Sequence, residues 1–373
     1  MPLSSQAVDR LEFSAIPHRQ FSMKYSHLIS PDTQFHQLTE PFEIESGDVM
    51  VGVKVAYRTW GRLNANGDNA IHICHALTGS ADADEWWGPL FGLGRAFDPD
   101  RDFIVCSNVL GSCYGTTGPI SMNPATGKPY GPDFPSITVR DMVRLQARLM
   151  KELGVQKLRM AIGGSLGGMQ VLEWGKLYPD FVESIVSVAA SGRHSAWCIG
   201  ISEAQRQAIR SDPNWRGGWY DDDALPKQGL AAARMMAMIS YRAYESFEKR
   251  FGRKVQENGD RAVCSYLRYQ GQKLVDRFDA NTYLALIDAM DSHDVAEGRG
   301  DYYDVLRSID RPALVVTIDS DLLYPPVEQQ ELARFMPNAK LEWLYSPHGH
   351  DAFLIDMEAL NRSIVEFRRA VFS

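Results

Sequence analysis

The residue of this chain best suited to nucleophilic chemistry is a serine that lies among glycines. Ser165 belongs to the segment Gly163-Gly164-Ser165-Leu166-Gly167, which follows an apolar run and precedes a helix-like segment. This order predicts a strand, a sharp turn and a helix, the context in which G-x-S-x-G forms a nucleophile elbow. Glycines are needed there because the backbone of the serine is strained and crowded. Ser165 is the candidate nucleophile, although ordinary Gly-rich turns also match so short a motif.

A serine hydroxyl needs a base to take its proton and a carboxylate to orient that base. Candidates for both follow Ser165 in the order Ser, acid, His that an elbow enzyme requires. The acid lies in the segment 317–321 and the base in the segment 348–351, each just after a strand-like apolar run. Spacing alone leaves two acids and two bases open, namely Asp319, Asp321, His348 and His350.

Alternating strands and helices must position these side chains. Buried strands are predicted after residue 42 and again after residue 312, and they include Ile71–Ile73, Phe103–Val105, Leu158–Ile162, Ile185–Val188 and Ala313–Val316. A hairpin is predicted around Ser46–Asp48, with period-two residues that extend to Tyr57. A helix face at Met142, Leu145, Leu149 and Leu153 ends before Gly154. The pattern predicts an α/β fold with a mostly parallel sheet, in which sites form at the carboxyl ends of strands.

The middle of the chain has a different character, because residues 193–303 contain no convincing pair of strands. Helices are predicted at Ala231–Phe247 and Ala262–Phe278. We therefore expect an α/β-hydrolase core formed by residues 1–192 and 304–373, with a helical insertion at 193–303. Inserted helices above a strand-end site can act as a lid that excludes water. The alternative is an insertion that only extends the core or forms a dimer.

An oxyanion hole at such an elbow uses two backbone N–H groups. One donor should be Leu166, the residue after the nucleophile, and the other should come from the loop His75–Ser80, where Leu77 is the candidate. The side chains of this loop give little information, because any residue except proline supplies an N–H. We interpret His75 and the nearby His72 as structural, since no set of metal ligands accompanies them. No metal is expected.

Composition excludes several classes of protein. The chain has 373 residues and a formal net charge of -8, which argues against a nucleic-acid-binding protein. Its five cysteines are odd in number and form no C-x-x-C pair, which suits a reducing cytoplasm better than a disulfide framework or a zinc cluster. The segment Met1–His18 carries Asp9, Arg10 and Glu12 and does not match a signal peptide. No apolar run approaches the roughly 18 residues that a membrane span needs.

Longer motifs make the chain resemble a known family. They are His75–Gly79, Asn108–Gly111, Gly115–Pro124, Pro129–Gly131, Phe134-Pro135, Gly163–Trp174, Arg193–Ser195, Tyr241-Arg242, Ser320-Asp321 and Gly349–Leu354. With these motifs the chain closely resembles the homoserine O-acyltransferases of the α/β-hydrolase superfamily, best known as homoserine O-acetyltransferases. The resemblance extends from about Phe42 to the C-terminus, and its motifs are far more specific than G-x-S-x-G alone. It implies an α/β-hydrolase fold with an inserted helical lid.

The resemblance implies a catalytic triad of Ser165, Asp321 and His350. The family's acid follows a serine in a Ser-Asp pair, and its catalytic histidine opens the sequence His-Asp-Ala-Phe. This pattern selects one member of each doublet that spacing leaves open.

The resemblance also implies how the acceptor substrate is bound. An arginine and a tyrosine on a lid helix, together with the aspartate after the catalytic histidine, help the family to bind homoserine, and they correspond to Arg234, Tyr241 and Asp351. Homoserine is a zwitterion, so its carboxylate suits a guanidinium and its ammonium suits a carboxylate. From the residues alone, Arg234 and Tyr241 are two helical turns apart and could simply share a packing face.

The implied reaction transfers an acetyl group from acetyl-CoA to L-homoserine through an acyl-serine intermediate, in methionine biosynthesis. Acetyl-CoA is then a co-substrate, no cofactor is permanently bound, and neither nucleic acid nor a membrane is a partner. A homodimer in the cytoplasm is expected. Transfer of succinyl, transfer to serine, and hydrolysis by the same triad remain alternatives, because fold alone does not separate them. A binding protein without catalysis is disfavoured because all three triad positions are filled. No phosphate-binding motif locates a groove for coenzyme A.

Overall fold

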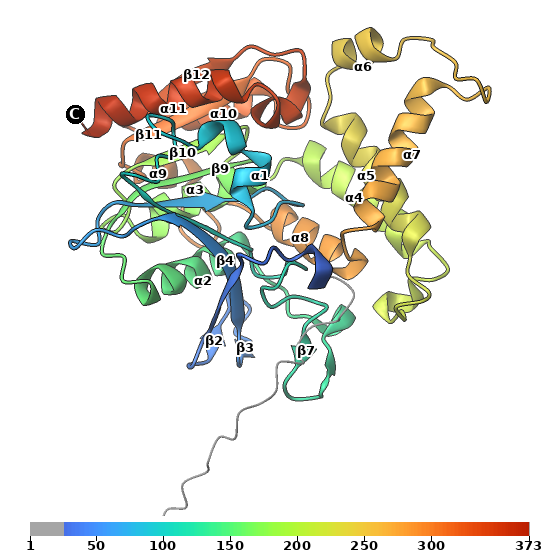
Figure 1. Cartoon of the computed structure of the whole chain (residues 1–373), viewed down its shortest axis with the longest axis horizontal. Helices are drawn as coiled ribbons and strands as arrows, with labels where there is room; N and C mark the ends of the chain where they lie inside the picture. Colours follow the sequence, from blue (N-terminus) through green and yellow to red (C-terminus); the bar gives the residue numbers. More distant parts are fainter. Residues whose placement is uncertain (1–25, 373) are drawn as a thin grey trace, which may run out of the picture.

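An eight-stranded sheet forms the centre of the protein in a computed structural model that describes residues 26–372 (Figure 1). The strand order is β1-β4-β6-β5-β9-β10-β11-β12. In this order, the neighbouring strands β6, β5, β9, β10, β11 and β12 run parallel. Strand β4 pairs antiparallel with both β1 and β6. The prediction of a mostly parallel sheet is therefore confirmed. The segment Met1–His18, in which no signal peptide is predicted, lies outside the described residues.

The strands of the main sheet are mostly buried and contain the predicted apolar runs. They are β1 (Gln34–Gln37), β4 (Lys54–Gly61), β5 (Ala70–Cys74), β6 (Phe103–Ser107), β9 (Leu158–Gly164), β10 (Ile185–Val188), β11 (Ala313–Ile318) and β12 (Ala339–Leu344). Two small hairpins complete the strands, one formed by β2 (Phe42–Glu43) and β3 (Val49–Met50), the other by β7 (Met122–Asn123) and β8 (Lys128–Pro129).

The predicted hairpin around Ser46–Asp48 is only partly correct. Strands β2 and β3 pair as expected, but the extension to Tyr57 is wrong, because that residue lies in β4 of the main sheet. Strand β1, which pairs with β4, was not predicted, since Phe35 is its only large apolar residue.

Helices cover both faces of the sheet, because alternate residues of its strands point to opposite sides. Ala161 of β9 belongs to one apolar cluster, whereas Met160 and Ile162 belong to the other. The first cluster includes residues of α2 (Val139–Glu152), α3 (Leu166–Leu177), α9 (Tyr302–Arg307) and α10 (Pro326–Phe335). The second includes residues of α1 (Ala83–Trp86) and α11 (Met357–Phe372). In Figure 1, α2 and α11 lie on opposite sides of the sheet.

Helix α2 shows how local sequence sets the boundaries of an element. The Thr138 side chain accepts the N–H of Asp141, and the Asp141 carboxylate accepts the N–H of Thr138, so a capping box begins the helix. Gly154, with φ of 83°, follows the last turn in the left-handed region that glycine tolerates. The predicted helix and its end before Gly154 are confirmed.

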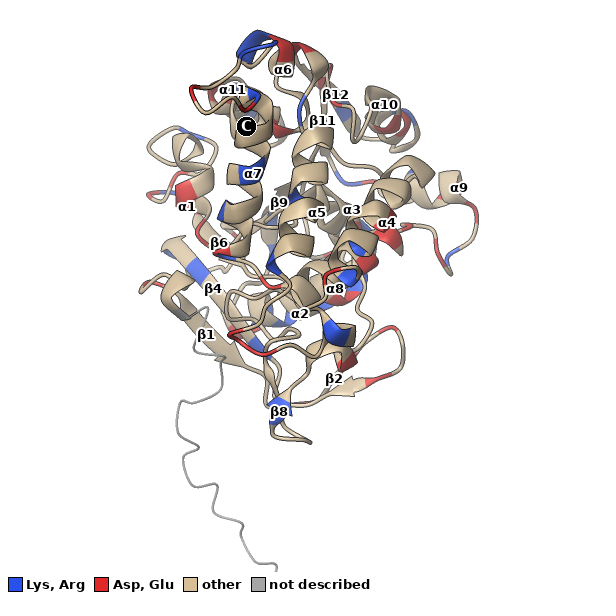
Figure 2. Ribbon diagram, turned by 90° about the vertical axis from the view of Figure 1, so that its right-hand side faces the viewer, with Lys and Arg blue, Asp and Glu red and all other residues tan. Residues whose placement is uncertain are grey.

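Between β10 and β11 the described chain forms helices and loops, with isolated bridges but no strand. The inserted helices are α4 (Ala196–Arg210), α5 (Lys227–Ser240), α6 (Tyr244–Arg250), α7 (Ala262–Val275) and α8 (Ala280–Asp291). Figure 2 shows α5 and α7 side by side at the front of this group. They approach so closely at Gly271 that a Cβ there would lie 2.9 Å from the carbonyl oxygen of Ala231.

The prediction of one helix over Ala231–Phe247 is wrong, because the chain breaks between α5 and α6. The carbonyl oxygen of Tyr241 accepts the N–H of Asp351, at 3.1 Å, so it is used outside the helix. The backbone of Gly349 also packs there, and a Cβ on it would lie 2.6 Å from the nitrogen of Ala243. The second predicted helix, Ala262–Phe278, ends at Val275, and the carbonyl oxygen of Arg277 beyond it accepts the Tyr114 hydroxyl.

The packing of α3 against β5 generates a prediction about stability. A Cβ at Gly167 would lie 2.1 Å from the carbonyl oxygen of Cys74, a rigid backbone atom. Gly167→Ala should therefore lower the free energy of unfolding by at least about 1–3 kcal/mol, as overpacking does. The control is Gly200→Ala in exposed α4, where a Cβ meets nothing within 4 Å and should add about 0.5–1 kcal/mol. Urea denaturation measures both, and equal effects would contradict the proposed close contact.

Candidate active site

Ser165 sits at a strained turn between β9 and α3. Its φ of 58° and ψ of -125° place a residue with a side chain in a region that costs about 1–3 kcal/mol. The chain can turn this sharply because residue 163 is a glycine. A Cβ at this position would lie only 2.5 Å from the Cys74 carbonyl oxygen. The Ser165 N–H donates to the carbonyl oxygen of Val188, at 3.0 Å, which fixes the turn to the end of β10. The predicted strand, turn and helix are confirmed.

Asp321 and His350 form a buried pair on the same edge of the sheet. Asp321 follows β11 and His350 lies in the 3-10 helix Gly349–Leu354 beyond β12. Nδ1 of His350 lies 2.7 Å from Oδ2 of Asp321, and both residues are nearly inaccessible to solvent. The other carboxylate oxygen of Asp321 accepts the N–H groups of Leu323 and Tyr324, at 2.8 and 3.0 Å. These three hydrogen bonds fix the orientation of the carboxylate.

The Asp321 carboxylate sets the protonation of His350. Burial lowers the pKa of this histidine, but the charge of Asp321 and the hydrogen bond to it outweigh burial, so the pKa is raised from 6.5. Because Nδ1 faces a carboxylate, we assign the proton of the neutral ring to Nδ1. Nε2 is then the nitrogen with a free lone pair, as a general base requires.

The other members of the two doublets lie elsewhere. Asp319 is exposed, and its Oδ1 accepts the N–H of Ser346 at 2.8 Å. Nδ1 of His348 is buried without a hydrogen-bond partner among the described residues. The structure thus brings Asp321 and His350 together, and within the described residues neither Asp319 nor His348 forms a hydrogen bond or ion pair with them.

Phe353 links the serine elbow to the histidine. Its ring centroid lies 5.5 Å from that of His350. The same ring crowds Gly164, where a Cβ would lie 2.7 Å from a ring carbon. Ser165 Oγ makes no hydrogen bond to any residue in the range 26–372, and catalytic hydrogen bonds are often long before substrate binds. The glycine before the serine and the histidine therefore contact one phenyl ring.

The N–H groups of Leu77 and Leu166 are available as oxyanion donors. Neither donates a hydrogen bond to any residue that the structure describes. Leu166 is the first residue of α3, where an N–H has no partner within the helix. Leu77 follows β5, the strand next to β9, so both donors come from neighbouring strand ends.

The candidate acceptor-binding residues form a second layer around His350. The Tyr241 ring lies 5.7 Å from the His350 ring, and the Arg234 guanidinium lies 5.4 Å from the centroid of Tyr241. Burial raises the pKa of Asp351 above its usual value. The charges of Arg242 and His350 act in the opposite direction, but burial has the larger effect. Arg242 Nε lies 3.0 Å from Oδ2 of Asp351 without hydrogen-bond geometry, so the contact is an ion pair.

Sequence reasoning missed two side chains at this site. Arg242 belongs to the recognised Tyr241-Arg242 motif, but only the structure pairs it with Asp351. Tyr324 has no motif, yet its ring lies 5.3 Å from the His350 ring. A signal for Tyr324 was its position three residues after the acid, where a turn begins.

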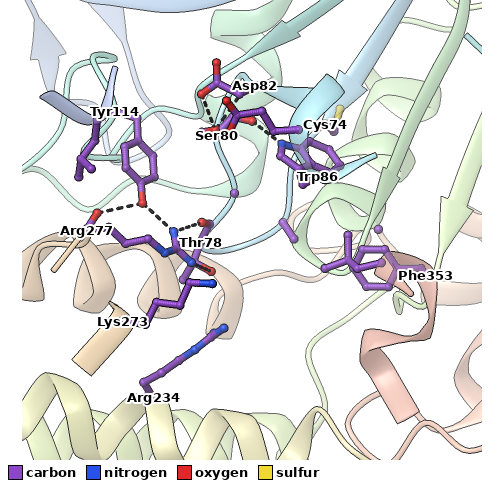
Figure 3. Close-up of a pocket in the computed structure, with 16 residues that line it drawn as sticks. Cys74, Thr78, Ser80, Asp82, Trp86, Tyr114, Arg234, Lys273, Arg277 and Phe353 are labelled. Carbon is purple, nitrogen blue, oxygen red and sulfur yellow. Dashed lines mark hydrogen bonds between the residues drawn. The ribbon is translucent and has the colours of Figure 1, made fainter. Parts of the chain in front are cut away.

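A cavity of about 500 Å³ opens beside the elbow (Figure 3). Gly164 and Phe353 line it on the side of the sheet, and Arg234, Lys273 and Arg277 line it on the side of the inserted helices. No carboxylate of the described chain pairs with any of these three cations. Arg277 instead donates to the carbonyl oxygen of Thr78, at 2.8 Å, and so contacts the loop that carries Leu77.

Residues 26–372 provide no cluster of three His, Cys, Asp or Glu side chains that could hold a metal ion. His72, buried next to Cys74 and Ser107, contacts both through its ring nitrogens. Burial and the charge of His75 lower the pKa of His72 to about 3, so this ring is neutral and structural. Within the same range, no helix combines the length and apolar character that a membrane span needs.

Comparison with known proteins adds a family to this geometry. The family model described as alpha/beta hydrolase fold matches residues 69–356. A homoserine O-acetyltransferase of Nostoc punctiforme is 68% identical over 347 residues, which cover 92% of this chain and 98% of that protein. Among solved structures, the homoserine O-acetyltransferase of Bacillus anthracis matches with a TM-score of 0.84 and 27% identity, over 90% of this chain and 97% of that one.

A hydrolase is equally similar in fold. The crystal structure of esterase E22 matches with a TM-score of 0.84 and 30% identity, over 90% of this chain and 99% of that one. The fold predicted from the sequence and the family resemblance are both confirmed. The chain belongs to the α/β-hydrolase fold family and, within it, to the homoserine O-acetyltransferases.

Proposed function

We propose that this enzyme transfers an acetyl group from acetyl-CoA to the hydroxyl of L-homoserine, a step of methionine biosynthesis. The observation that carries the proposal is the Asp321–His350 pair, with its 2.7 Å hydrogen bond, on the same sheet edge as the strained Ser165. The unengaged N–H groups of Leu77 and Leu166 supply the remaining requirement of acyl transfer, which is stabilisation of an oxyanion.

In the first half-reaction, Ser165 Oγ attacks the thioester carbonyl while Nε2 of His350 takes the hydroxyl proton. The negative charge that develops on the carbonyl oxygen is stabilised by the Leu77 and Leu166 N–H groups. The intermediate collapses when the carbon–sulfur bond breaks and His350 returns the proton to the leaving thiolate. The products are free coenzyme A and an acetyl ester on Ser165.

In the second half-reaction, the hydroxyl of homoserine replaces the thiol. His350 takes its proton, the oxygen attacks the acetyl-serine carbonyl, and the same N–H groups stabilise the oxyanion. The bond to Ser165 Oγ then breaks, and His350 returns the proton to the serine. Asp321 remains ionised throughout and stabilises the imidazolium that forms in each half-reaction.

Arg234, Tyr241 and Asp351 are the proposed acceptor-binding residues. Arg234 would pair with the carboxylate of homoserine and Asp351 with its ammonium. The ion pair between Arg242 and Asp351 bears on this assignment, because the ammonium must share the Asp351 carboxylate with a guanidinium. Tyr241, between Arg234 and His350, would limit the space beside the base.

We propose that the inserted helices act as a lid. Water competes with homoserine for the acetyl-enzyme, so a transferase must restrict water at the site. Helices α5 and α7 contribute Arg234 and Lys273 to one wall of the cavity, which supports this role.

The lid wall of the cavity also suits the donor. Coenzyme A carries several phosphate charges, whereas homoserine has a single carboxylate. With Arg234 assigned to the acceptor, Lys273 and Arg277 remain as cations that can attract an anionic donor in a chain of net charge -8. Asp82 and Glu85 line the other side, but Asp82 is already paired with Arg58, at 3.0 Å.

The main alternative is hydrolysis, in which water accepts the acyl group. It is supported by the shared fold of esterase E22. A succinyl donor or a serine acceptor would use the same chemistry and differ only in pocket shape. The high identity to a homoserine O-acetyltransferase favours acetyl transfer to homoserine.

We also propose a homodimer formed through the lid. Large apolar side chains are exposed on its outer helices, including Met236 and Ile239 on α5 and Tyr269 on α7, each more than a third exposed. Exposed apolar surface of this kind is typical of a protein interface.

A cytoplasmic location is our proposal for the cellular compartment. All five cysteines are free thiols, four of them buried. Burial raises the pKa of the Cys74 thiol well above its usual range, so it is unreactive. Free thiols suit a reducing compartment.

The first test concerns the nucleophile. With acetyl-CoA alone, the wild type should release a burst of one thiol per site and gain the mass of one acetyl group on Ser165, because the first half-reaction needs no acceptor. Ser165→Ala should show no burst, whereas Ser363→Ala, on the remote helix α11, should behave as the wild type. Stopped-flow thiol detection and peptide mass spectrometry measure this. An acetyl group on another residue would refute the mechanism, and no homoserine-dependent turnover would refute the proposed function.

The second test separates the doublets. Asp321→Asn and His350→Ala should lower kcat on the order of ten-thousand-fold, as loss of a triad member does. The matched variants Asp319→Asn and His348→Ala should lose far less, because neither side chain forms a hydrogen bond with the pair. Steady-state kinetics with acetyl-CoA and homoserine measures all four, and a reversed order would show that the assignment is wrong.

The third test concerns the donor phosphates. Lys273→Glu should lower the ratio of kcat/KM for acetyl-CoA to kcat/KM for acetyl-N-acetylcysteamine by about tenfold or more, because only the first donor carries phosphate. Lys249→Glu, on α6 outside the cavity, makes the same change in net charge and should leave the ratio unaltered. Equal ratios in both variants would exclude Lys273 from donor binding.

A further inference from the structure

A second histidine–aspartate pair lies next to the proposed triad. Nδ1 of His194 lies 3.0 Å from Oδ1 of Asp291, the last residue of helix α8. The other carboxylate oxygen of Asp291 accepts a hydrogen bond from Arg206 of α4, at 2.6 Å. His194 belongs to the Arg193–Ser195 motif, to which the proposed reaction gives no role.

Tyr324 connects this pair to the triad. Its hydroxyl lies 3.0 Å from Nε2 of His194. Its backbone N–H donates to Oδ1 of Asp321, and its ring lies 5.3 Å from the ring of His350. One residue therefore contacts the second histidine, the triad acid and the triad base.

The hydrogen bonds of this group have a defined direction. Because Nδ1 of His194 faces the Asp291 carboxylate, we assign its proton there, and Nε2 is left as an acceptor. Burial raises the pKa of Tyr324 well above its ordinary value, so the phenol stays protonated. Its hydroxyl therefore donates a hydrogen bond to Nε2 of His194. The Tyr324 side chain is fully buried, and a buried hydroxyl without a partner is costly. The bond to His194 therefore selects one position for the tyrosine.

We propose that His194 and Tyr324 are positioning residues, which hold Asp321 and His350 in register with each other and connect them to the inserted helices. The inference rests on the proposed function, since it concerns the geometry of the same triad. The Asp321 carboxylate accepts two of its three hydrogen bonds from the backbone N–H groups of Leu323 and Tyr324. Through Asp291 and Arg206, the position of this segment depends on α8 and α4 of the insertion.

The closing experiment is a double-mutant cycle. Tyr324→Phe removes one oxygen and keeps the ring against His350, and His194→Phe removes its partner. Each should lower kcat by about tenfold or more and leave both KM values within about twofold, because the triad is misaligned while the substrate contacts remain. If both act through one hydrogen bond, the double variant should lose no more than the worse single variant.

The control is Tyr303→Phe, which removes a hydroxyl that bonds Glu331 at 3.2 Å, away from the triad. It should leave kcat unchanged, so a fall in kcat confined to the Tyr324 and His194 variants is not a general effect of losing a tyrosine hydroxyl. His194→Gln, which can still accept the Tyr324 hydroxyl, should recover part of the lost kcat.

Two results would overturn the inference. One is an unchanged kcat in Tyr324→Phe, which folds with little disturbance because only an oxygen is lost. The other is additive losses in the double variant. Both presuppose a wild type that acetylates homoserine, so they are distinct from failure of the proposed function, in which the wild type itself shows no homoserine-dependent release of thiol.

Discussion

The left-handed backbone of Ser165 is the constraint on which the rest of the site depends. A residue with a side chain remains at φ of 58° only where its surroundings over-determine the turn. Here Gly163 and Gly167 let β9 and α3 press against the Cys74 carbonyl, and Val188 accepts the serine N–H. The elbow is therefore fixed by the two strands beside β9, which are β5 and β10.

The same strand order divides the chemistry between the two sides of the serine. Strand β5, on one side, is followed by the loop that carries Leu77, and its neighbour β9 is followed by Ser165 and Leu166. On the other side, β10, β11 and β12 follow in order, and the last two are followed by Asp321 and His350. Parallel strands end at one edge, so a site built from residues far apart in sequence needs no special folding step. The insertion contacts this edge at several points, which include Arg277 to Thr78, Arg242 to Asp351 and His194 to Tyr324.

The parts of the structure with a strong local signal were predictable from the sequence. The apolar runs of the buried strands, the capped helix before Gly154 and the glycines around Ser165 each specify an element by themselves. Strand β1 lacked such a signal, because an edge strand with one large apolar residue does not repeat with period two. The break after Ser240 was invisible for another reason, since it depends on Gly349 and Asp351, more than a hundred residues later. The same holds for Arg242 and Tyr324, whose partners are set by tertiary contacts rather than by spacing.

The fold shared with esterase E22 shows where the choice between transfer and hydrolysis must lie. A serine, a histidine and two N–H groups serve water and an alcohol equally well, so the triad cannot make that choice. The acceptor can win over water only if its binding energy holds its hydroxyl against the acetyl-serine, and this requires charges that water does not need. The proposed charges of this kind are the Arg234 guanidinium, which lies 5.4 Å from the Tyr241 ring, and the partly buried Asp351 carboxylate, which follows His350. Both charges depend on the insertion. Arg234 is part of α5, and Asp351 is paired with Arg242, which lies in the insertion just after α5. In the proposed acceptor assignment, the inserted helices rather than the sheet therefore contribute the charges that would favour homoserine over water.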